Sequence, residues 1–221
     1  MEKEAYFTPD GLAQKTQAML AELAMLGLPG IRRRTERLAQ FDPSRAALLV
    51  LDMQRYFLQS DSHAWVPSGA SILPGLSGLA GKFTEQGLRV VFTRHLNTPE
   101  NAGSLKTWWR DLLTLDNPLS VISPEFDTSG GVVIHKSQYD AFYGTDLESY
   151  LRDHAVTQVV VGGVMTHLCC ETTARAAFVR GFEVFFLVDG TATYNERFHL
   201  AALLNLAHGF AILASTGEVM P

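Results

Sequence analysis

Six short apolar runs recur along the sequence after residue 41, and stretches with a helical pattern separate them. The runs span residues 46–51, 88–93, 132–136, 158–163, 183–188 and 210–214. Strands that are covered by helices on both faces are continuously apolar, and right-handed crossover connections make such strands parallel. The sequence therefore predicts an α/β protein, a three-layer α/β/α sandwich around a six-stranded parallel sheet.

The segments between these runs carry signals of helices and of one long loop. Helical patterns cover residues 72–86, 146–153, 168–180 and 196–208. Gly87 and Gly181 directly follow two of them, and glycine suits the C-terminus of a helix. Between residues 97 and 128, Asn, Pro and Gly interrupt the pattern, so we expect an irregular segment over the functional site. Trp108 and Trp109 within it are expected to form an apolar wall.

Residues 1–40 have a pattern of their own, with apolar side chains at the helical positions Leu12, Met19, Leu23 and Leu26. Gly and Pro then interrupt this pattern at residues 27–30. Such a segment has too few apolar residues to fold alone, so it should pack on the rest of the chain or on a neighbouring subunit. We therefore predict an N-terminal helical arm, residues 1–40, followed by one domain, residues 41–221.

The net charge and the hydropathy pattern of the sequence argue against two classes of binding partner, nucleic acids and membranes. The formal net charge of −5 provides no basic face for a phosphate backbone, which argues against nucleic-acid binding. The apolar runs have the length of strands, and no cationic and apolar leader precedes them, so the sequence predicts neither a membrane span nor a signal peptide. We expect a cytoplasmic protein that acts on a small molecule.

Three reactive side chains stand where predicted strands end. Asp52 follows the run 46–51, Lys136 ends a β-branched run, and Cys169 follows a fourth strand at the start of a helix. The carboxyl ends of parallel strands form the crevice in which α/β proteins bind ligands, so these side chains should converge. A helix N-terminus favours the thiolate form of a cysteine. A nucleophile, a carboxylate and an ammonium together predict an enzyme.

The two cysteines, Cys169 and Cys170, are adjacent in the sequence. Neighbouring residues rarely reach the geometry that a disulfide prefers, which argues against a redox role for the pair. Their spacing also differs from that of a structural zinc site. Cys170 points about 100° around the helix from Cys169, so we expect it in the core.

Three sequence segments resemble the isochorismatase-like hydrolase superfamily, which includes nicotinamidases, carbamoylsarcosine amidohydrolases and isochorismatases. They are LDMQRYF at 51–57, KSQYDAFYGTDL at 136–147, and GVMTHLC at 163–169. The resemblance implies that Asp52, Lys136 and Cys169 are the catalytic residues. It also implies a cis peptide bond between Val164 and Met165, an oxyanion hole formed by the backbone amides of Met165 and Cys169, and a homodimer or homotetramer.

The implied reaction is hydrolysis of a C–N bond in a small amide or carbamoyl compound. Asp52 would take the proton of Cys169, Lys136 would hold the carboxylate in place, and the sulfur would attack a carbonyl carbon. An acyl-enzyme would form, and water would release it. The side chains that we expect to line the substrate pocket are Gln54, His95, Trp108, Tyr139, Phe142 and His167.

The sequence departs from the nicotinamidase pattern at the metal site. Those enzymes have an Asp-x-His-x-x-His type of site after the second strand, whereas residues 93–98 here read TRHLNT. Only His95 remains of the ligands, and a metal site needs three or four protein ligands. We therefore predict no metal and no other cofactor.

Two other functions stay open at this point. Residues 52–58 also resemble isochorismatases, which cleave a vinyl ether; there Asp52 would act as an acid and Cys169 would be dispensable. The chain could instead be a non-catalytic interaction protein that binds a partner through its arm and aromatic segment. Alkylation of Cys169 no faster than that of a free thiol near neutral pH would support this last alternative.

Overall fold

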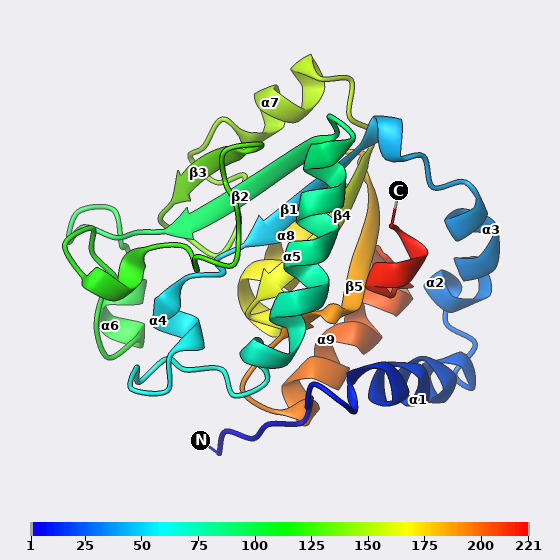
Figure 1. Cartoon of the computed structure of the whole chain (residues 1–221), viewed down its shortest axis with the longest axis horizontal. Helices are drawn as coiled ribbons and strands as arrows, with labels where there is room; N and C mark the ends of the chain where they lie inside the picture. Colours follow the sequence, from blue (N-terminus) through cyan, green and yellow to red (C-terminus); the bar gives the residue numbers. More distant parts are fainter. Residues whose placement is uncertain (1, 221) are drawn as a thin grey trace.

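A six-stranded parallel sheet runs through the middle of the molecule (Figure 1). The computed structural model describes residues 2–220, so the outermost residues of the predicted arm and domain, 1 and 221, lie outside it. The strands are β1 Ala46–Leu51, β2 Arg89–His95, β3 Val132–Lys136, β4 Gln158–Val164, β5 Glu183–Ala192 and β6 Ile212–Ala214. Their order is β3-β2-β1-β4-β5-β6, and every pair is parallel.

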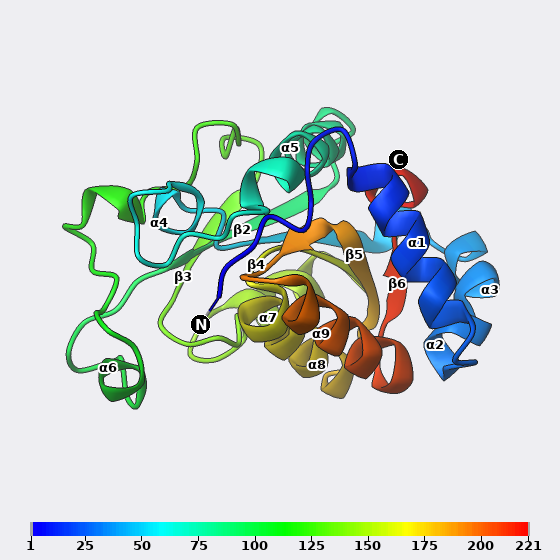
Figure 2. The ribbon, with the colours of Figure 1, turned by 90° about the horizontal axis from the view of Figure 1, so that it is seen from below.

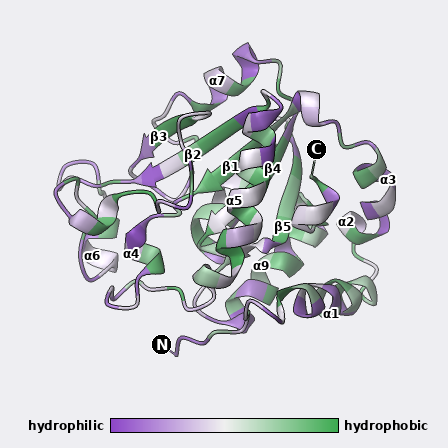
Figure 3. Cartoon of the chain, viewed as in Figure 1, coloured by the Kyte–Doolittle hydropathy of each residue, from purple (hydrophilic) through white to green (hydrophobic). Residues whose placement is uncertain are grey.

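Helices cover both faces of this sheet, as Figure 2 shows in side view. On one face lies α5 Gly69–Glu85; on the other lie α7 Leu147–Asp153, α8 Glu171–Val179 and α9 Glu196–Gly209. All residues of β1 and β4 are buried, and the hydropathy colouring in Figure 3 shows how apolar the central strands are. The predicted three-layer α/β/α sandwich with a six-stranded parallel sheet is therefore confirmed.

Some predicted boundaries are wrong. β2 continues to His95, and β5 continues to Ala192, because after a register shift its end still pairs with the end of β4. The helix predicted from residue 168 begins only at Glu171. A wide π-helical turn, Thr166–Cys170, precedes it, in which the amide of Cys170 donates to the carbonyl of Met165, 3.2 Å away.

The N-terminal arm contains α1 Leu12–Ala24, α2 Pro29–Arg32 and α3 Arg34–Ala39, which lie beside the β5 and β6 side of the sheet (Figures 1 and 2). Met19, Leu20 and Leu23 of α1 are buried and belong to the same apolar core as the strands. The Arg34 side chain donates to the carbonyl of Leu213 on β6 at 2.8 Å. The arm thus packs on the rest of its own chain, which is the first of the two predicted arrangements.

The remaining elements are short. Two of them are α4 Arg55–Leu58 and α6 Leu105–Trp108, and single 3-10 turns lie at Pro43–Arg45, Pro118–Ser120 and Thr216–Glu218. Between β2 and β3 the chain is mostly irregular, as the sequence predicts for residues 97–128. Within residues 2–220, no helix has the length and apolarity needed to cross a bilayer.

Candidate active site

The carboxyl ends of three strands bring Asp52, Lys136 and Cys169 together. Asp52 follows β1, Lys136 is the last residue of β3, and Cys169 lies in the turn after β4. The Nζ atom of Lys136 lies 2.7 Å from Oδ2 of Asp52 and donates to Sγ of Cys169 at 3.3 Å. A third bond from Nζ reaches the carbonyl of Gln138 at 2.9 Å. All three N–H groups of the ammonium therefore have partners, and its position is well defined.

Thr93 and Gly163 hold Asp52 in place. Thr93 Oγ1 donates to Oδ1 of Asp52 at 2.6 Å and accepts from its backbone amide at 3.0 Å. Asp52 has φ 52°, a left-handed conformation that few non-glycine residues adopt. Gly163, with φ 117°, lets β4 approach β1, since a Cβ atom there would lie 2.1 Å from the carbonyl oxygen of Leu51. From the sequence we predict a site role for neither residue. Both end an apolar run, and Gly163 also begins the segment GVMTHLC.

The three reactive groups form one buried, coupled system. Burial raises the pKa of the Asp52 carboxyl, but the charge of Lys136, together with His95 and hydrogen bonds, brings its pKa below the ordinary value. Burial lowers the pKa of Lys136, but Asp52 and Cys169 more than offset this and raise its pKa. Burial and the charge of Asp52 raise the pKa of the Cys169 thiol to about 12. The resting site thus contains a carboxylate, an ammonium and a neutral thiol.

This charge state corrects the prediction that a helix N-terminus holds Cys169 as a thiolate. The residue lies in the wide turn before α8 and beside a carboxylate, so the thiolate would add a second negative charge to a buried site. Slow alkylation near neutral pH is consequently expected of the enzyme itself. The alkylation test proposed from the sequence does not separate an enzyme from an interaction protein.

We expect the rate at which iodoacetamide alkylates Cys169 to rise about tenfold per pH unit from about pH 7 to 10, because only the thiolate reacts. Tandem mass spectrometry of the peptide that contains both cysteines assigns the alkyl group to Cys169 or Cys170 and measures this rate. The adjacent Cys170 is fully buried and serves as the internal control. A rate that reaches its plateau near pH 7 would contradict the raised pKa.

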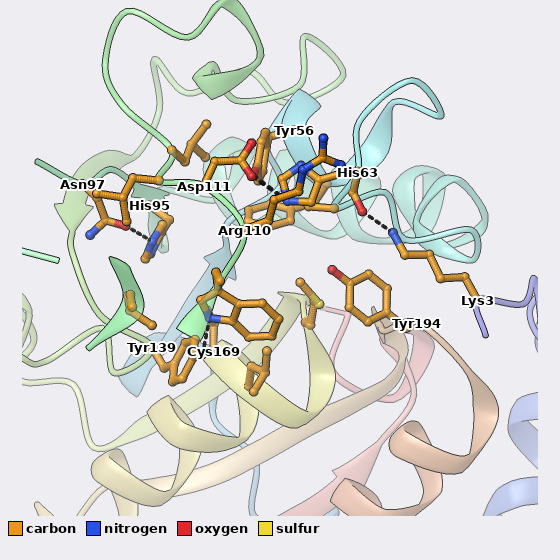
Figure 4. Close-up of a pocket in the computed structure, with 18 residues that line it drawn as sticks. Lys3, Tyr56, His63, His95, Asn97, Arg110, Asp111, Tyr139, Cys169 and Tyr194 are labelled. Carbon is orange, nitrogen blue, oxygen red and sulfur yellow. Dashed lines mark hydrogen bonds and ion pairs between the residues drawn. The ribbon is translucent and has the colours of Figure 1, made fainter. Parts of the chain in front are cut away.

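A pocket of about 300 Å³ opens beside Cys169 (Figure 4). Aromatic and apolar side chains form much of its wall, among them Tyr56, Trp109, Tyr139, Met165, Leu168 and Tyr194. Nε1 of Trp109 donates to the hydroxyl of Tyr139 at 2.6 Å, which joins the irregular segment to the loop after β3. Charged groups, including Lys3 and Arg110, also line it. The pocket therefore suits a small, partly apolar molecule.

Tyr139 and His95 line this pocket as expected, but the other four predicted lining residues do not. Trp108 points to solvent with 76% of its surface exposed, and its neighbour Trp109 forms the wall instead. Gln54 is fully buried, and its side-chain amide donates to the carbonyl of Ser120 at 2.6 Å and accepts from the amide of His95 at 2.7 Å. It ties two segments together beneath the site.

Phe142 and His167 also lie outside the pocket lining. Phe142 is buried and stacks on Phe182, with ring centroids 6.1 Å apart. The ring of His167 stacks on Phe198 at 4.4 Å, and its Nδ1 lies 2.7 Å from Oγ1 of Thr193. Both side chains find partners on neighbouring elements, which turn them away from the pocket.

The residues near His95 do not fit the metal site that the nicotinamidase resemblance implies. Nε2 of His95 lies 2.8 Å from Oδ1 of Asn97, which can only accept, so this nitrogen carries the proton. Burial lowers the pKa of His95 to about 4, and the ring is neutral at neutral pH. Among residues 2–220, no three His, Cys, Asp or Glu side chains are grouped so that they could hold a metal ion.

The fold and the site define an α/β enzyme whose reactive groups lie at the carboxyl edge of a parallel sheet. The family model of the isochorismatase domain matches residues 46–218. The chain belongs to this family, the isochorismatase-like hydrolases, and it is a hydrolase.

Similarity to individual proteins supports this family membership. The chain is 41% identical to nicotinamidase 3 of Arabidopsis thaliana, over 79% of this chain and 86% of that protein. It is 29% identical to an isochorismatase of Bacillus subtilis, over 81% of this chain but only 58% of that protein. Among solved structures, a cysteine hydrolase from Pseudomonas syringae pv. phaseolicola superposes with a TM-score of 0.77 at 25% identity, over 81% of this chain and 92% of that one.

Proposed function

We propose that the chain hydrolyses the C–N bond of a small amide through a covalent intermediate on Cys169. The observation that carries this proposal is the position of Sγ: it accepts a hydrogen bond from Lys136, which is ion-paired with Asp52, and it faces an aromatic pocket. The 41% identity to a nicotinamidase supports an aromatic carboxamide, with nicotinamide as the first compound to test.

Asp52 begins the reaction as the general base. It takes the proton of the Cys169 thiol while Sγ forms a bond to the carbonyl carbon and the C=O electron pair moves to oxygen. Lys136 stabilises the negative charge that develops on sulfur. The backbone amides of Met165 and Cys169, two residues of the pocket wall, are the proposed donors to the oxyanion. The peptide bond between Val164 and Met165 is cis.

The intermediate then collapses. The C–N bond breaks, the protonated Asp52 gives its proton to the leaving nitrogen, and ammonia or a small amine departs from a thioester on Cys169. Water attacks the thioester as Asp52 takes one of its protons. The C–S bond breaks, the sulfur regains the proton from Asp52, and a carboxylic acid leaves the pocket.

Ammonia release across a panel of amides tests the proposal. The panel contains nicotinamide, benzamide, an aliphatic amide of similar size and a carbamoyl compound, and isochorismate is assayed in parallel for pyruvate. We expect the aromatic carboxamides to have the highest kcat/KM because the pocket wall is aromatic. Turnover of isochorismate alone would contradict C–N hydrolysis.

Vinyl-ether cleavage is the second candidate function, and the 29% identity to an isochorismatase favours it. That reaction would use Asp52 as an acid and needs no sulfur nucleophile. The intact Cys169 beside Lys136 favours C–N hydrolysis instead. The non-catalytic alternative loses its support because the chain belongs to a family of hydrolases.

We expect activity to be independent of bound metal, since His95 has no companion ligands among the described residues. Dialysis against EDTA should leave kcat and KM unchanged, and added Zn²⁺ or Mn²⁺ should not raise them. Elemental analysis of the dialysed protein verifies that the metal was removed. A loss of activity that Zn²⁺ restores would contradict this expectation.

The predicted homodimer or homotetramer and the cytoplasmic location stay predictions.

A further inference from the structure

The N-terminal segment, residues 2–8, reaches the mouth of the substrate pocket. Figure 2 shows this segment passing along the molecule before it enters α1, and Figure 4 shows Lys3 at the edge of the pocket. Lys3 lines the pocket together with His63 and Tyr194. The segment precedes residue 46, where the match to the isochorismatase domain begins. One part of the pocket wall therefore comes from outside the matched domain.

Lys3 connects two walls that belong to different parts of the chain. One wall is the α4–α5 loop, residues 59–68, and the other is the β5–α9 connection, residues 193–195. Nζ of Lys3 donates to the carbonyls of His63 at 2.6 Å and Trp65 at 2.9 Å, both in the first wall. The same ammonium lies 4.4 Å from the ring centroid of Tyr194 in the second wall.

The residues after Lys3 repeat this two-sided attachment. The amide of Glu4 donates to the carbonyl of Tyr194 at 2.8 Å, and the hydroxyl of Tyr6 accepts from the amide of Thr193 at 3.0 Å. On the other side, the amide of Phe7 donates to Oγ of Ser68 at 3.0 Å. The segment is therefore bonded to both walls along its length, and Lys3 is the residue of this described segment that lines the pocket.

We propose that Lys3 is a positioning residue that holds the two walls at the spacing the substrate needs. A lysine ammonium suits this task because it has three N–H donors and binds the face of an aromatic ring. When the walls are held apart correctly before the substrate arrives, less ordering is required on binding, so Lys3 acts on KM more than on kcat. This inference rests on the proposed amide hydrolysis only for its kinetic readout.

Three variants test the inference. Lys3→Met keeps the aliphatic stem and removes the donors; we expect KM for the best amide to rise about tenfold while kcat stays within about twofold. Lys3→Arg should restore most of the wild-type KM, because a guanidinium also donates and stacks on tyrosine. Lys82→Met is the matched control: Lys82 is exposed on α5, pairs with Glu85 at 3.0 Å and does not line the pocket, so KM should not change.

Hydrogen exchange of the ligand-free protein gives a readout that needs no turnover. In Lys3→Met, peptides covering both walls should exchange faster than in wild type, and in Lys82→Met they should not. Unchanged exchange would overturn the proposal, and so would faster exchange with an unchanged KM. A raised KM without faster exchange would show direct contact with substrate and would also overturn positioning. If no amide is hydrolysed, the proposed function fails, while exchange still decides whether Lys3 holds the walls.

Discussion

Replacement of Cys169 by alanine should abolish amide hydrolysis, with kcat falling by about 10⁴-fold or more, as is typical when a covalent nucleophile is removed. The reason is that, within residues 2–220, no other nucleophile is held beside Asp52 and Lys136 and faces the pocket. Ammonia release under saturating substrate measures the loss. Fold should be preserved because alanine removes only the sulfur atom from a residue at the pocket wall.

The neighbouring cysteine provides a matched control. Cys170 is fully buried in the apolar core, so Cys170→Ala removes the same atom from the next residue. We expect this variant to retain kcat and to lose about 1 kcal/mol or more of its free energy of unfolding through the cavity that it leaves. If Cys169→Ala folds and keeps most of its ammonia release, the covalent mechanism is wrong. If wild type and Cys169→Ala instead turn over isochorismate equally well and release no ammonia from amides, vinyl-ether cleavage becomes the better proposal.

Replacement of Asp52 by asparagine should damage both activity and stability. It removes the general base, so we expect kcat to fall by about 10⁴-fold. It also leaves the Lys136 charge buried without its ion-pair partner, which costs about 3 to 5 kcal/mol of the free energy of unfolding. Assays of ammonia release and denaturant unfolding measure the two losses separately.

A second substitution separates the charge effect from a packing effect. In the double variant Asp52→Asn/Lys136→Met the buried ammonium is gone, so its stability should exceed that of Asp52→Asn while its activity stays lost. If the double variant is less stable than either single variant, the ion pair does not account for the loss. Equal activity of Asp52→Asn and wild type would show that Asp52 is not the general base.

The sign of the pH dependence of stability follows from the ion pair between Asp52 and Lys136. The pKa of Asp52 is lowered in the folded protein, so its stabilising effect is present above its unfolded pKa and is lost as pH falls through the folded value. The pKa of Lys136 is raised, so its effect is present below its unfolded pKa and is lost as pH rises through the folded value. The pair therefore stabilises the fold across the whole neutral range.

The central part of the site could be predicted because it depends on regular structure. Asp52, Lys136 and Cys169 each follow or end an apolar run, and parallel pairing forces the carboxyl ends of neighbouring strands to one edge of the sheet. The pattern of apolar runs is therefore sufficient to predict that these three side chains lie together. The ionisation of Cys169 does not follow from this position, because burial and the Asp52 charge decide it.

The pocket wall was harder to predict because irregular segments form much of it. Adjacent tryptophans at 108 and 109 have equal apolar character, and only the backbone geometry after α6 turns Trp109 inward and Trp108 outward. The contribution of Lys3 depends on carbonyl groups of His63 and Trp65, about 60 residues further along the chain. Every residue has a main-chain carbonyl, so the residue types at positions 63 and 65 do not indicate this contact.

The position of Lys3 has a practical consequence for producing the protein. A purification tag placed next to residue 2 would lie beside the pocket mouth and would compete with the contacts of Lys3 and Glu4. Near the other end of the described residues, Glu218 pairs with Arg34 of α3 and does not line the pocket. A C-terminal tag is therefore the appropriate choice, and an N-terminal tag should be cleaved before any affinity for substrate is measured.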